Sequence, residues 1–234
     1  MRKFVGVLFA AGFVVVALAQ PAVASVIPVS SRGALGGNLT VEWSLFGPTG
    51  SLIITPDTQN AGPLSVTVGS SEGELARHTE GVDFTGNFAP GDQLLSDAGS
   101  SSDSFIIRFS TPVEGVATQI ERHSVQGPFT GHLYFFDAGN SLLGEVTVSG
   151  DATMTNNNSA VVIGGISTGG FDISRINFTV DNLPQIDNGL TESGDLLINR
   201  LDLIAPAAVP EPSEFAVLVP ALLLIAAASR RRNR

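Results

Sequence analysis

Apolar and polar residues alternate with a period of two along much of the interior of the chain. In one such segment Phe105, Ile107 and Phe109 fall on one side and Arg108 on the other. This spacing is typical of strands that bury one face. Further short β-prone runs are Val41–Leu45, Leu64–Val68, His132–Asp137, Leu142–Val148, Ile173–Val180 and Leu196–Ile204. Helical periodicity is scarce between the two chain ends, so the pattern predicts an all-β domain, a jelly-roll-like β-sandwich.

Glycine-rich polar segments separate the predicted strands. Residues 137–140 read Asp-Ala-Gly-Asn and predict a hairpin turn between two of the strands. Asn60–Ser104 and Asp151–Gly170 are long, polar and rich in glycine, which indicates loops, and Glu72–His78 could form a helical turn. Loops at the ends of a sandwich are where function is expected.

The first 24 residues have the pattern of a secretory signal peptide. Arg2 and Lys3 precede an uninterrupted apolar helix-forming segment, Phe4–Ala19. A transmembrane anchor is the alternative, but the short apolar run and the small-x-small triplet favour cleavage after export by the Sec machinery. The residues expected to define the cleavage site are Ala22, Ala24 and Ser25.

The other end carries three consecutive features. An extended motif, Val209-Pro210-Glu211-Pro212-Ser213, precedes a 14-residue apolar segment, 215–228. A helix of that length spans about 21 Å, less than the roughly 30 Å of a hydrocarbon core, so it predicts a short and weak transmembrane helix. The cationic residues that would keep the extreme C-terminus on the cytoplasmic side are Arg230, Arg231, Arg232 and Arg234.

This order of motif, short helix and arginine cluster resembles the PEP-CTERM sorting tail, which is also labelled the ice-binding protein C-terminal domain. The resemblance covers 209–234. It implies recognition by an exosortase, removal of the helix after transient anchoring in the inner membrane, and delivery to the cell surface or extracellular matrix. The alternative is a C-terminal anchor that is never cut. The expected organisation is a signal peptide at 1–24, an ectodomain at 25–204, a linker at 205–208 and the tail at 209–234.

The charge of the ectodomain is strongly acidic. Setting aside the two terminal signals leaves six arginines, no lysine and 20 carboxylates, a net charge near −14. Such a surface repels phosphate backbones, so nucleic-acid binding is excluded as a function class. The chain has no cysteine, which also excludes disulfides and cysteine-ligated metals.

A second resemblance covers roughly 104–204 and is similar to the ectodomains that often precede this tail. It rests on Phe-Asp-Ala-Gly-Asn in 136–140, Leu-Leu-Gly-Glu-Val-Thr-Val in 142–148 and Ile-x-x-Ile-x-Phe in 173–178. It implies a jelly-roll sandwich that acts in the extracellular matrix. The last strand of those ectodomains often has paired aspartates, whereas this chain reads Ile198-Asn199-Arg200-Leu201-Asp202. The departure puts an inherited calcium site in doubt.

One segment matches a hydrolase motif. Gly69-Ser70-Ser71-Glu72-Gly73 fits G-x-S-x-G, with Ser71 as the nucleophile and His123 or His132 as its base. No alternating strand and helix pattern follows, and glycine- and serine-rich chains produce this motif by chance. We therefore expect a non-catalytic protein, with a secreted serine hydrolase as a lesser alternative.

Metal sites have little support in the sequence. His78, His123 and His132 lack zinc-ligand spacing, and no segment matches a calcium-binding loop. Calcium prefers oxygen ligands and is abundant outside cells, so one structural calcium stays open, while turn and capping roles explain isolated aspartates. The aspartates in question are Asp83, Asp92, Asp97, Asp103, Asp137, Asp151, Asp172, Asp181 and Asp187.

Four aromatic residues could form a sugar-stacking platform: Trp43, Tyr134, Phe135 and Phe136. Trp43 alternates in step with Val41 and is expected in the core. On the later strand, Tyr134 and Phe136 face one way and Phe135 the other, so at least one face is internal. Core packing is therefore favoured. The main functional expectation is an exopolysaccharide- or biofilm-associated matrix protein, and the alternative is a carbohydrate- or calcium-binding module.

Overall fold

The computed structural model describes residues 24–70, 73–97, 104–122, 126–181, 186–187, 190–191 and 196–207. Most of the expected signal peptide, including Ala22, lies outside the described residues. The whole expected sorting tail does so too, with Val209, Pro210, Glu211, Pro212, Ser213, the apolar segment 215–228, Arg230, Arg231, Arg232 and Arg234. Among the residues that are described, no helix is long and apolar enough to cross a membrane.

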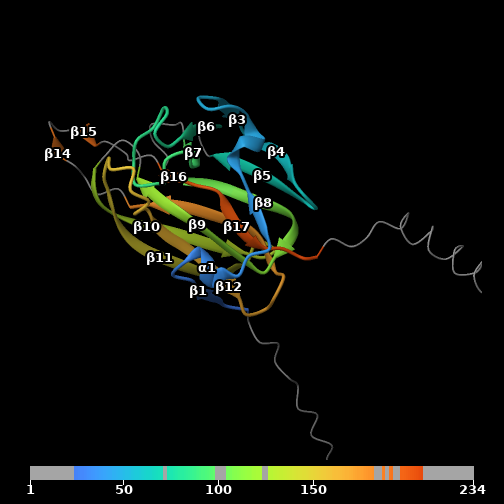
Figure 1. The fold of residues 1–234 in the computed structure, drawn as a ribbon. Coiled ribbons are helices and arrows are strands. Elements are labelled where there is room, and N and C mark those ends of the chain that lie inside the picture. The colour runs from blue at the N-terminus through green and yellow to red at the C-terminus, as the bar shows by residue number, and fades with distance from the viewer. Residues whose placement is uncertain are drawn as a thin grey trace, which may run out of the picture.

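Two large sheets account for most of the described chain (Figure 1). Sheet A contains β1 (Val26–Pro28), β2 (Leu39–Val41), β3 (Leu52–Ile54), β6 (Glu74–Thr79), β7 (Gln93–Asp97), β9 (Gly115–Arg122), β12 (Val161–Ser167), β16 (Leu196–Ile198) and β17 (Leu201–Ile204). Sheet B contains β4 (Asp57–Ala61), β5 (Leu64–Ser70), β8 (Ser104–Val113), β10 (Gly127–Phe136), β11 (Leu142–Ala152) and β13 (Ile173–Val180). The remaining elements are helix α1 (Arg32–Leu35), the 3-10 turn η1 (Trp43–Phe46) and a small hairpin, β14 (Ile186–Asp187) with β15 (Leu190–Thr191).

The strand order is that of a jelly roll. Numbered 1 to 8 along the chain, the central strands β7, β8, β9, β10, β11, β12, β13 and β16 run 6-3-8-1 in sheet A and 5-4-7-2 in sheet B. The chain therefore crosses repeatedly between the sheets, as in two nested Greek keys. The predicted all-β sandwich is confirmed.

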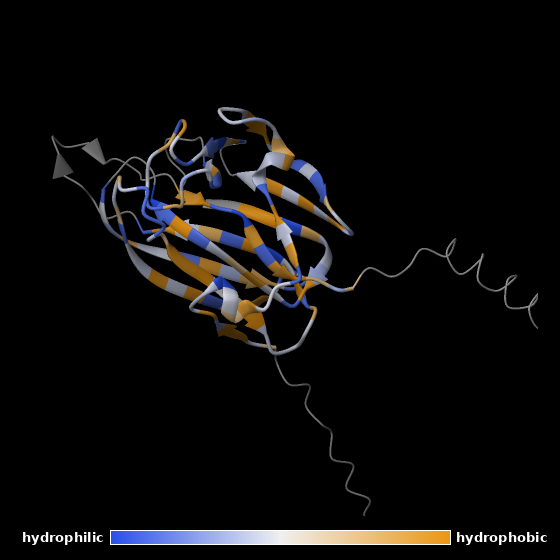
Figure 2. Cartoon of the chain, in the orientation of Figure 1, coloured by the Kyte–Doolittle hydropathy of each residue, from blue (hydrophilic) through white to orange (hydrophobic). Residues whose placement is uncertain are grey.

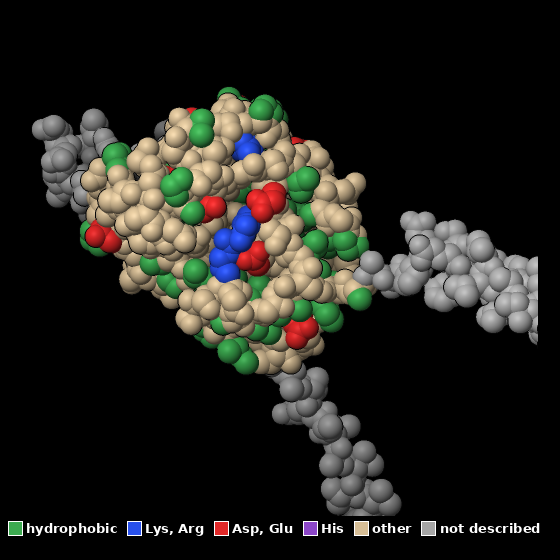
Figure 3. Space-filling view, in the orientation of Figure 1, with side chains coloured by type: hydrophobic (Ala, Val, Ile, Leu, Met, Phe, Trp, Pro, Cys, Tyr) green, Lys and Arg blue, Asp and Glu red, His purple; other side chains and the backbone are tan. Residues whose placement is uncertain are grey.

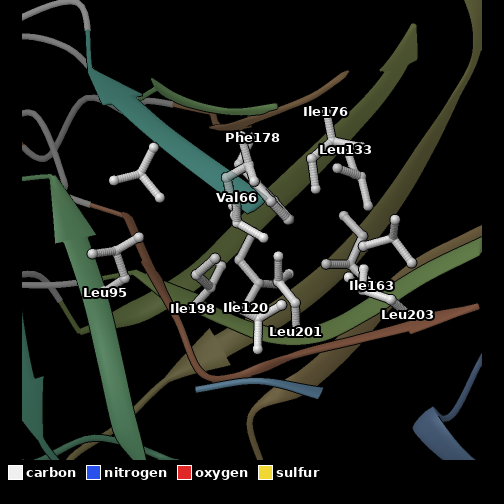
Figure 4. Packing of buried hydrophobic residues seen from close by; sticks show 14 of the residues in the cluster. Val66, Leu95, Ile120, Leu133, Ile163, Ile176, Phe178, Ile198, Leu201 and Leu203 are labelled. Carbon is white, nitrogen blue, oxygen red and sulfur yellow. The ribbon is translucent and has the colours of Figure 1, made fainter. Parts of the chain in front are cut away.

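The core lies between the two sheets and is built from the inward side chains of both (Figure 4). Hydrophobic and hydrophilic positions alternate along several of these strands (Figure 2). On β10 Leu133 and Phe135 are fully buried. They pack in one cluster with Ile120 of β9 and with Ile176 and Phe178 of β13. Tyr134 and Phe136 point to the opposite side of the strand from Phe135, as the alternation predicts, and both are only partly buried.

The two sheets differ on their outer faces. The outer face of sheet A is covered at one end by α1, where Leu35 packs with Val29 and Ala117. At its other end Phe88 and Ala160, from the 81–92 and 153–160 loops, bury Leu197. The outward side chains of sheet B remain partly open to solvent. Sheet B therefore presents the larger uncovered surface.

Several local predictions were wrong. Glu72–His78 was expected to contain a helical turn, but residues 74–79 form β6, where pairing with β3 and β7 outweighs intrinsic preference. His78 thus lies on a strand and not in a loop. The segments expected to be loops also contain β7 and β12. Residues 43–46 form a 3-10 turn instead of continuing a strand, which leaves Leu45 40% exposed.

Two further boundaries differ from the prediction. The expected strand Leu196–Ile204 is divided into β16 and β17. His132 lies in the middle of β10 and does not open the strand. The strand reaches further back because residues 127–131 pair with β11.

Gly164 shows why the glycine-rich part of β12 is a strand. It pairs with Ala117 of β9. A Cβ atom on Gly164 would lie 2.5 Å from the Val116 carbonyl oxygen and 2.7 Å from the Ala117 Cα atom. The glycine therefore permits close approach of two backbones, although glycine pairs in a sequence usually indicate loops.

We predict that Gly164→Ala destabilises the domain by about 1–3 kcal/mol, because backbone atoms of β9 must shift to admit the methyl group. Gly33→Ala in α1 is the matched control, since a Cβ atom there meets nothing within 4 Å. Urea denaturation of both variants measures the difference. Equal stability of the two variants would contradict the close approach of β9 and β12.

Candidate functional site

The open face of sheet B carries a row of aromatic and polar side chains along β10. His132, Tyr134 and Phe136 alternate with buried residues and point outward. We call these three side chains the β10 strip. Antiparallel pairing places Thr179, Asn177 and Arg175 of β13 opposite them in that order. Thr147 and Glu145 of β11 lie opposite His132 and Tyr134 on the other side.

One end of the β10 strip is acidic. His132 Nδ1 lies 2.7 Å from a Glu145 oxygen, and His132 Nε2 lies 3.1 Å from an Asp181 oxygen. The hydrogen bond from His132 is the main cause that lowers the pKa of Glu145. Burial and the neighbouring Glu145 raise the pKa of Tyr134. His132 and Tyr134 lie with nearly parallel rings, 8° apart, so their orientation is well defined.

The other end of the strip is basic. The Arg175 guanidinium lies over the Phe136 ring, with Cζ 3.8 Å from the ring centroid. Such a cation–π contact holds the guanidinium plane against the ring. Arg108 of β8 is the direct cross-strand partner of Arg175. Burial, and then the charge of Arg108, lower the pKa of Arg175.

A hollow of about 280 Å³ continues this face beyond Arg108. Its floor is formed by β5 and β8, and its rim by the segment between β3 and β4. The residues that line it include Pro56, Val68, Ser70, Ile106 and Arg108. The open face thus combines a shallow depression, one exposed row of rings and several hydrogen-bonding side chains.

This arrangement is suited to binding rather than to covalent chemistry. Aromatic rings contact the apolar faces of flat ligands, and convergent polar groups fix orientation. His132 is held by carboxylates at both ring nitrogens, and the hydroxyl of Thr147 lies 3.4 Å from Nδ1, further away than Glu145. The imidazole is therefore poorly placed to activate that hydroxyl as a nucleophile.

A second polar cluster lies on the covered face of sheet A. The Asn199 amide group donates to Asp92 at 3.1 Å and to the Gln119 side chain at 2.6 Å. Its oxygen accepts from the Gln119 backbone at 3.0 Å and from the Thr118 hydroxyl at 3.1 Å. The Trp43 indole donates to the Asn199 carbonyl oxygen. Asn199 is thus a satisfied buried amide at the place where the resemblance suggested a pair of carboxylates.

Two buried carboxylates hold the 81–92 loop against sheet A. Glu80 accepts from the Gly86 amide at 2.8 Å, and Glu121 accepts from the Asn87 amide at 2.7 Å. Both side chains are about 1% exposed. Burial raises the pKa of Glu121 to about 7, and burial also raises the pKa of Glu80. Loop order is therefore linked to the protonation of these two groups.

The serine hydrolase alternative receives no test, because Ser71 and one of its two candidate bases, His123, lie outside the described residues, while the other, His132, lies on β10. Asp103 also lies outside the described residues, and nothing is described of the Asp187 side chain. Among the described residues, no group of three or more histidine, aspartate or glutamate side chains could hold a metal ion. Structural calcium therefore stays an untested possibility.

Several aspartates have local partners of the kind predicted for turns. Asp83 accepts from the Thr79 amide, and Asp137 accepts from the Ser141 amide, both at 2.7 Å. Asp97 accepts from the Ser70 hydroxyl at 3.0 Å. Asp83 also lies 3.1 Å from His78. Asp151 and Asp172 lie at sheet B, in β11 and just before β13.

The aromatic residues divide between core and surface. Trp43 and Phe135 are fully buried, as predicted. Tyr134 and Phe136 reach the surface, so the core packing favoured from the sequence holds for only two of the four aromatic residues. Sequence reasoning missed Arg108 and Arg175. The signal available was the outward position of Arg108 and the alternation of polar residues in Ile173–Val180.

We predict that the stability of the domain falls as the pH rises. The pKa of Glu121 is above its unfolded value, so its contribution is complete below about pH 4.5 and is lost as the pH passes about 7. This group alone would make the fold about 2 kcal/mol less stable at about pH 8 than at about pH 5.

Glu121→Gln keeps a carbonyl acceptor for Asn87 but cannot ionise, and should flatten this dependence. Urea midpoints at both pH values measure it, with Glu74→Gln, at an exposed position, as the control. A pH dependence that survives unchanged in Glu121→Gln would show that this carboxylate is not its source.

No family model matches the chain, and no curated protein matches it. Among solved structures it is similar to a DUF4465 family protein from Bacteroides caccae, at 13% identity and a TM-score of 0.38 over 70% of this chain and 98% of that one. It is also similar to TmCBM61 in complex with β-1,4-galactotriose, at 16% identity and a TM-score of 0.31 over 60% and 88%. A third similarity is to the CBM22-1 xylan-binding domain from Paenibacillus barcinonensis, at 11% identity and a TM-score of 0.27 over 73% and 97%. Similarities of this size do not indicate what this chain binds.

Proposed function

We propose that this chain is an exported, non-catalytic protein whose β-sandwich binds a carbohydrate on the open face of sheet B. The observation that carries the proposal is the β10 strip, flanked by Asn177 and Arg175 on a face that no described element covers. Sugars offer apolar ring faces and many hydroxyl groups, and this face offers rings and hydrogen-bonding groups side by side.

The face is too polar to be a typical protein-binding surface. Most of the large exposed apolar side chains lie away from the β10 strip, at Ile27, Leu45, Leu52, Ile54, Val82, Met154 and Phe171. The exception is Leu142 of β11, which pairs with Phe136 at the end of the strip. Protein interfaces have an apolar core at their centre, whereas the strip has His132 and Tyr134 tied to charged groups.

The loop-covered end of sheet A is a poorer candidate for a ligand site. The hollow beside Glu121 and Arg122 has only about 30 Å³. That space holds about one or two waters and no sugar ring. The carboxylates there accept backbone hydrogen bonds from the 81–92 loop, so a structural role accounts for them.

The export part of the proposal rests on the two chain ends. The Ser25 amide donates to the Thr168 hydroxyl at 3.0 Å, and β1 begins at Val26. The residues at which the mature protein is expected to start are therefore part of the folded domain. The motif 209–213 and the arginine cluster support sorting by an exosortase. The mature domain would then act at the cell surface or in the extracellular matrix, in contact with exopolysaccharide.

We predict that Tyr134→Ala weakens glycan binding about tenfold or more, because it removes the central ring of the strip. A glycan array followed by isothermal titration calorimetry with the bound oligosaccharide measures this. Leu52→Ala is the control, since Leu52 is 62% exposed on β3 in sheet A. Binding that survives Tyr134→Ala unchanged, or no binding to any glycan by the wild type, would contradict the proposal.

We predict a separate result for sorting. Mature wild-type protein should lack residues 1–24 and the 215–228 segment, because both are removed during export. Replacing Pro210 and Pro212 with alanine should block the second cut and leave the chain in the inner membrane. Mass spectrometry of fractionated cells distinguishes these products. An intact arginine cluster on wild-type protein at the cell surface would refute cleavage.

A further inference from the structure

Two guanidinium groups face one another on the open side of sheet B. Arg175 of β13 and Arg108 of β8 are direct cross-strand partners. Like charges in this position destabilise a sheet. Among the described residues, neither arginine has an ion pair or a side-chain hydrogen bond to an acid. No acidic side chain among the described residues therefore offsets this repulsion, and Arg175 is stabilised instead by its cation–π contact with Phe136.

Two other arginines of the ectodomain have acidic partners. On the face with α1 and β17, Arg32 is paired with Asp202, and Arg200 lies 3.7 Å from Glu42. Figure 3 shows basic side chains next to acidic ones near the middle of that face. The ectodomain has only six arginines against 20 carboxylates, so acidic partners are plentiful. Among the described residues Arg77 and Arg122 also lack an acidic partner, but both are buried in sheet A, whereas Arg108 and Arg175 are direct cross-strand partners on an open face.

The position of Arg175 favours binding of an anion, because its guanidinium group is held in a fixed orientation. Its guanidinium lies on the Phe136 ring, and its Nε atom is buried. The ring fixes the plane of the group, so little side-chain freedom is lost when a ligand binds. A planar fork of N–H donors matches the two oxygens of a carboxylate. Arg108 is exposed beside it and adds a second positive charge.

The remainder of the face indicates what carries the anionic group. Tyr134 and Asn177 form the next outward row of the sheet, two residues along the strands from Phe136 and Arg175. Two residues along a strand correspond to about 7 Å, a separation suited to a ring and its acidic substituent. At the far end, Glu145 and Asp181 repel a second anion.

We propose that Arg108 and Arg175 bind the carboxylate of a uronic acid residue, so that the glycan recognised on sheet B is an acidic polysaccharide. This inference rests on the proposed function and gives it a ligand class. Tyr134 contacts the sugar ring, and the arginine pair selects for the acid. Binding relieves the repulsion between the two guanidinium groups, which couples ligand affinity to the stability of the sheet.

The test compares two matched ligand sets on the purified mature protein by isothermal titration calorimetry. The acidic set is oligogalacturonate, polygalacturonate and alginate, and the neutral set is galacto-oligosaccharide, galactan and mannan. Wild-type protein should bind at least one acidic ligand about tenfold or more tightly than its neutral counterpart. That preference should shrink as the salt concentration rises from about 50 mM to about 500 mM, since salt screens exposed charges. A sulfated galactan distinguishes carboxylate selectivity from general anion binding.

The variant Arg108→Gln/Arg175→Gln should lose the acidic preference about tenfold while retaining any neutral binding. Arg200→Gln on the opposite face is the matched control and should change neither. The variant removes both the like-charge repulsion and the cation–π contact with Phe136, so its melting temperature is measured alongside binding to recognise a folding defect.

The outcomes separate the two proposals. Equal binding of acidic and neutral sugars that depends on Tyr134 overturns the uronate inference and leaves the carbohydrate function intact. Tighter binding of the sulfated galactan than of its uronate counterpart also overturns carboxylate selection. Failure of every ligand in both sets to bind overturns the carbohydrate function and this inference together.

Discussion

The structure depends on burying one face of each sheet against the other. Leu133 and Phe135 of β10 are fully buried with Ile120 and Phe178 between the sheets. Without cysteine, this contact between two apolar faces must supply most of the stability. The strict alternation of β10 also sends Tyr134 and Phe136 to the opposite side. The same residues that build the core therefore fix the positions of the side chains on the open face.

Sheet A adds a second constraint because its outer face is covered as well. Covering it with loops brings polar backbone into a buried position, where every donor needs an acceptor. Glu80 and Glu121 accept the Gly86 and Asn87 amides, and burial of these carboxylates raises the pKa of Glu121 to about 7. Asn199 fills the middle of the same layer with satisfied hydrogen bonds. The polar residues of this layer are accounted for by structure, which is why the binding proposal is placed on sheet B.

The sequence was informative where local periodicity decides structure. It predicted the sandwich, the burial of Trp43 and the division of Tyr134 and Phe135 between opposite faces of one strand. It failed for β6, where pairing with β7 makes a strand of a segment with little intrinsic β preference. It failed for β12 because the adjacent Gly164 and Gly165 indicated a loop, although they pair with β9. It also could not pair Arg108 with Arg175, because that contact depends on the register of two strands distant in the chain. The sequence singled out aspartates as possible calcium ligands, whereas the charged residues that the structure places opposite one another on sheet B are Arg108 and Arg175.

The separation of charge on sheet B is the feature that links fold to function. In a chain with a surplus of carboxylates, unpaired arginines would be expected to acquire acidic neighbours by chance. The β10 strip instead keeps Glu145 and Asp181 at His132 and leaves Arg175 on Phe136. The repulsion between the two arginines lowers the stability of the sheet when no ligand is bound, and an external anion would relieve it. The stability of the fold alone does not explain this arrangement, whereas recognition of an acidic sugar does.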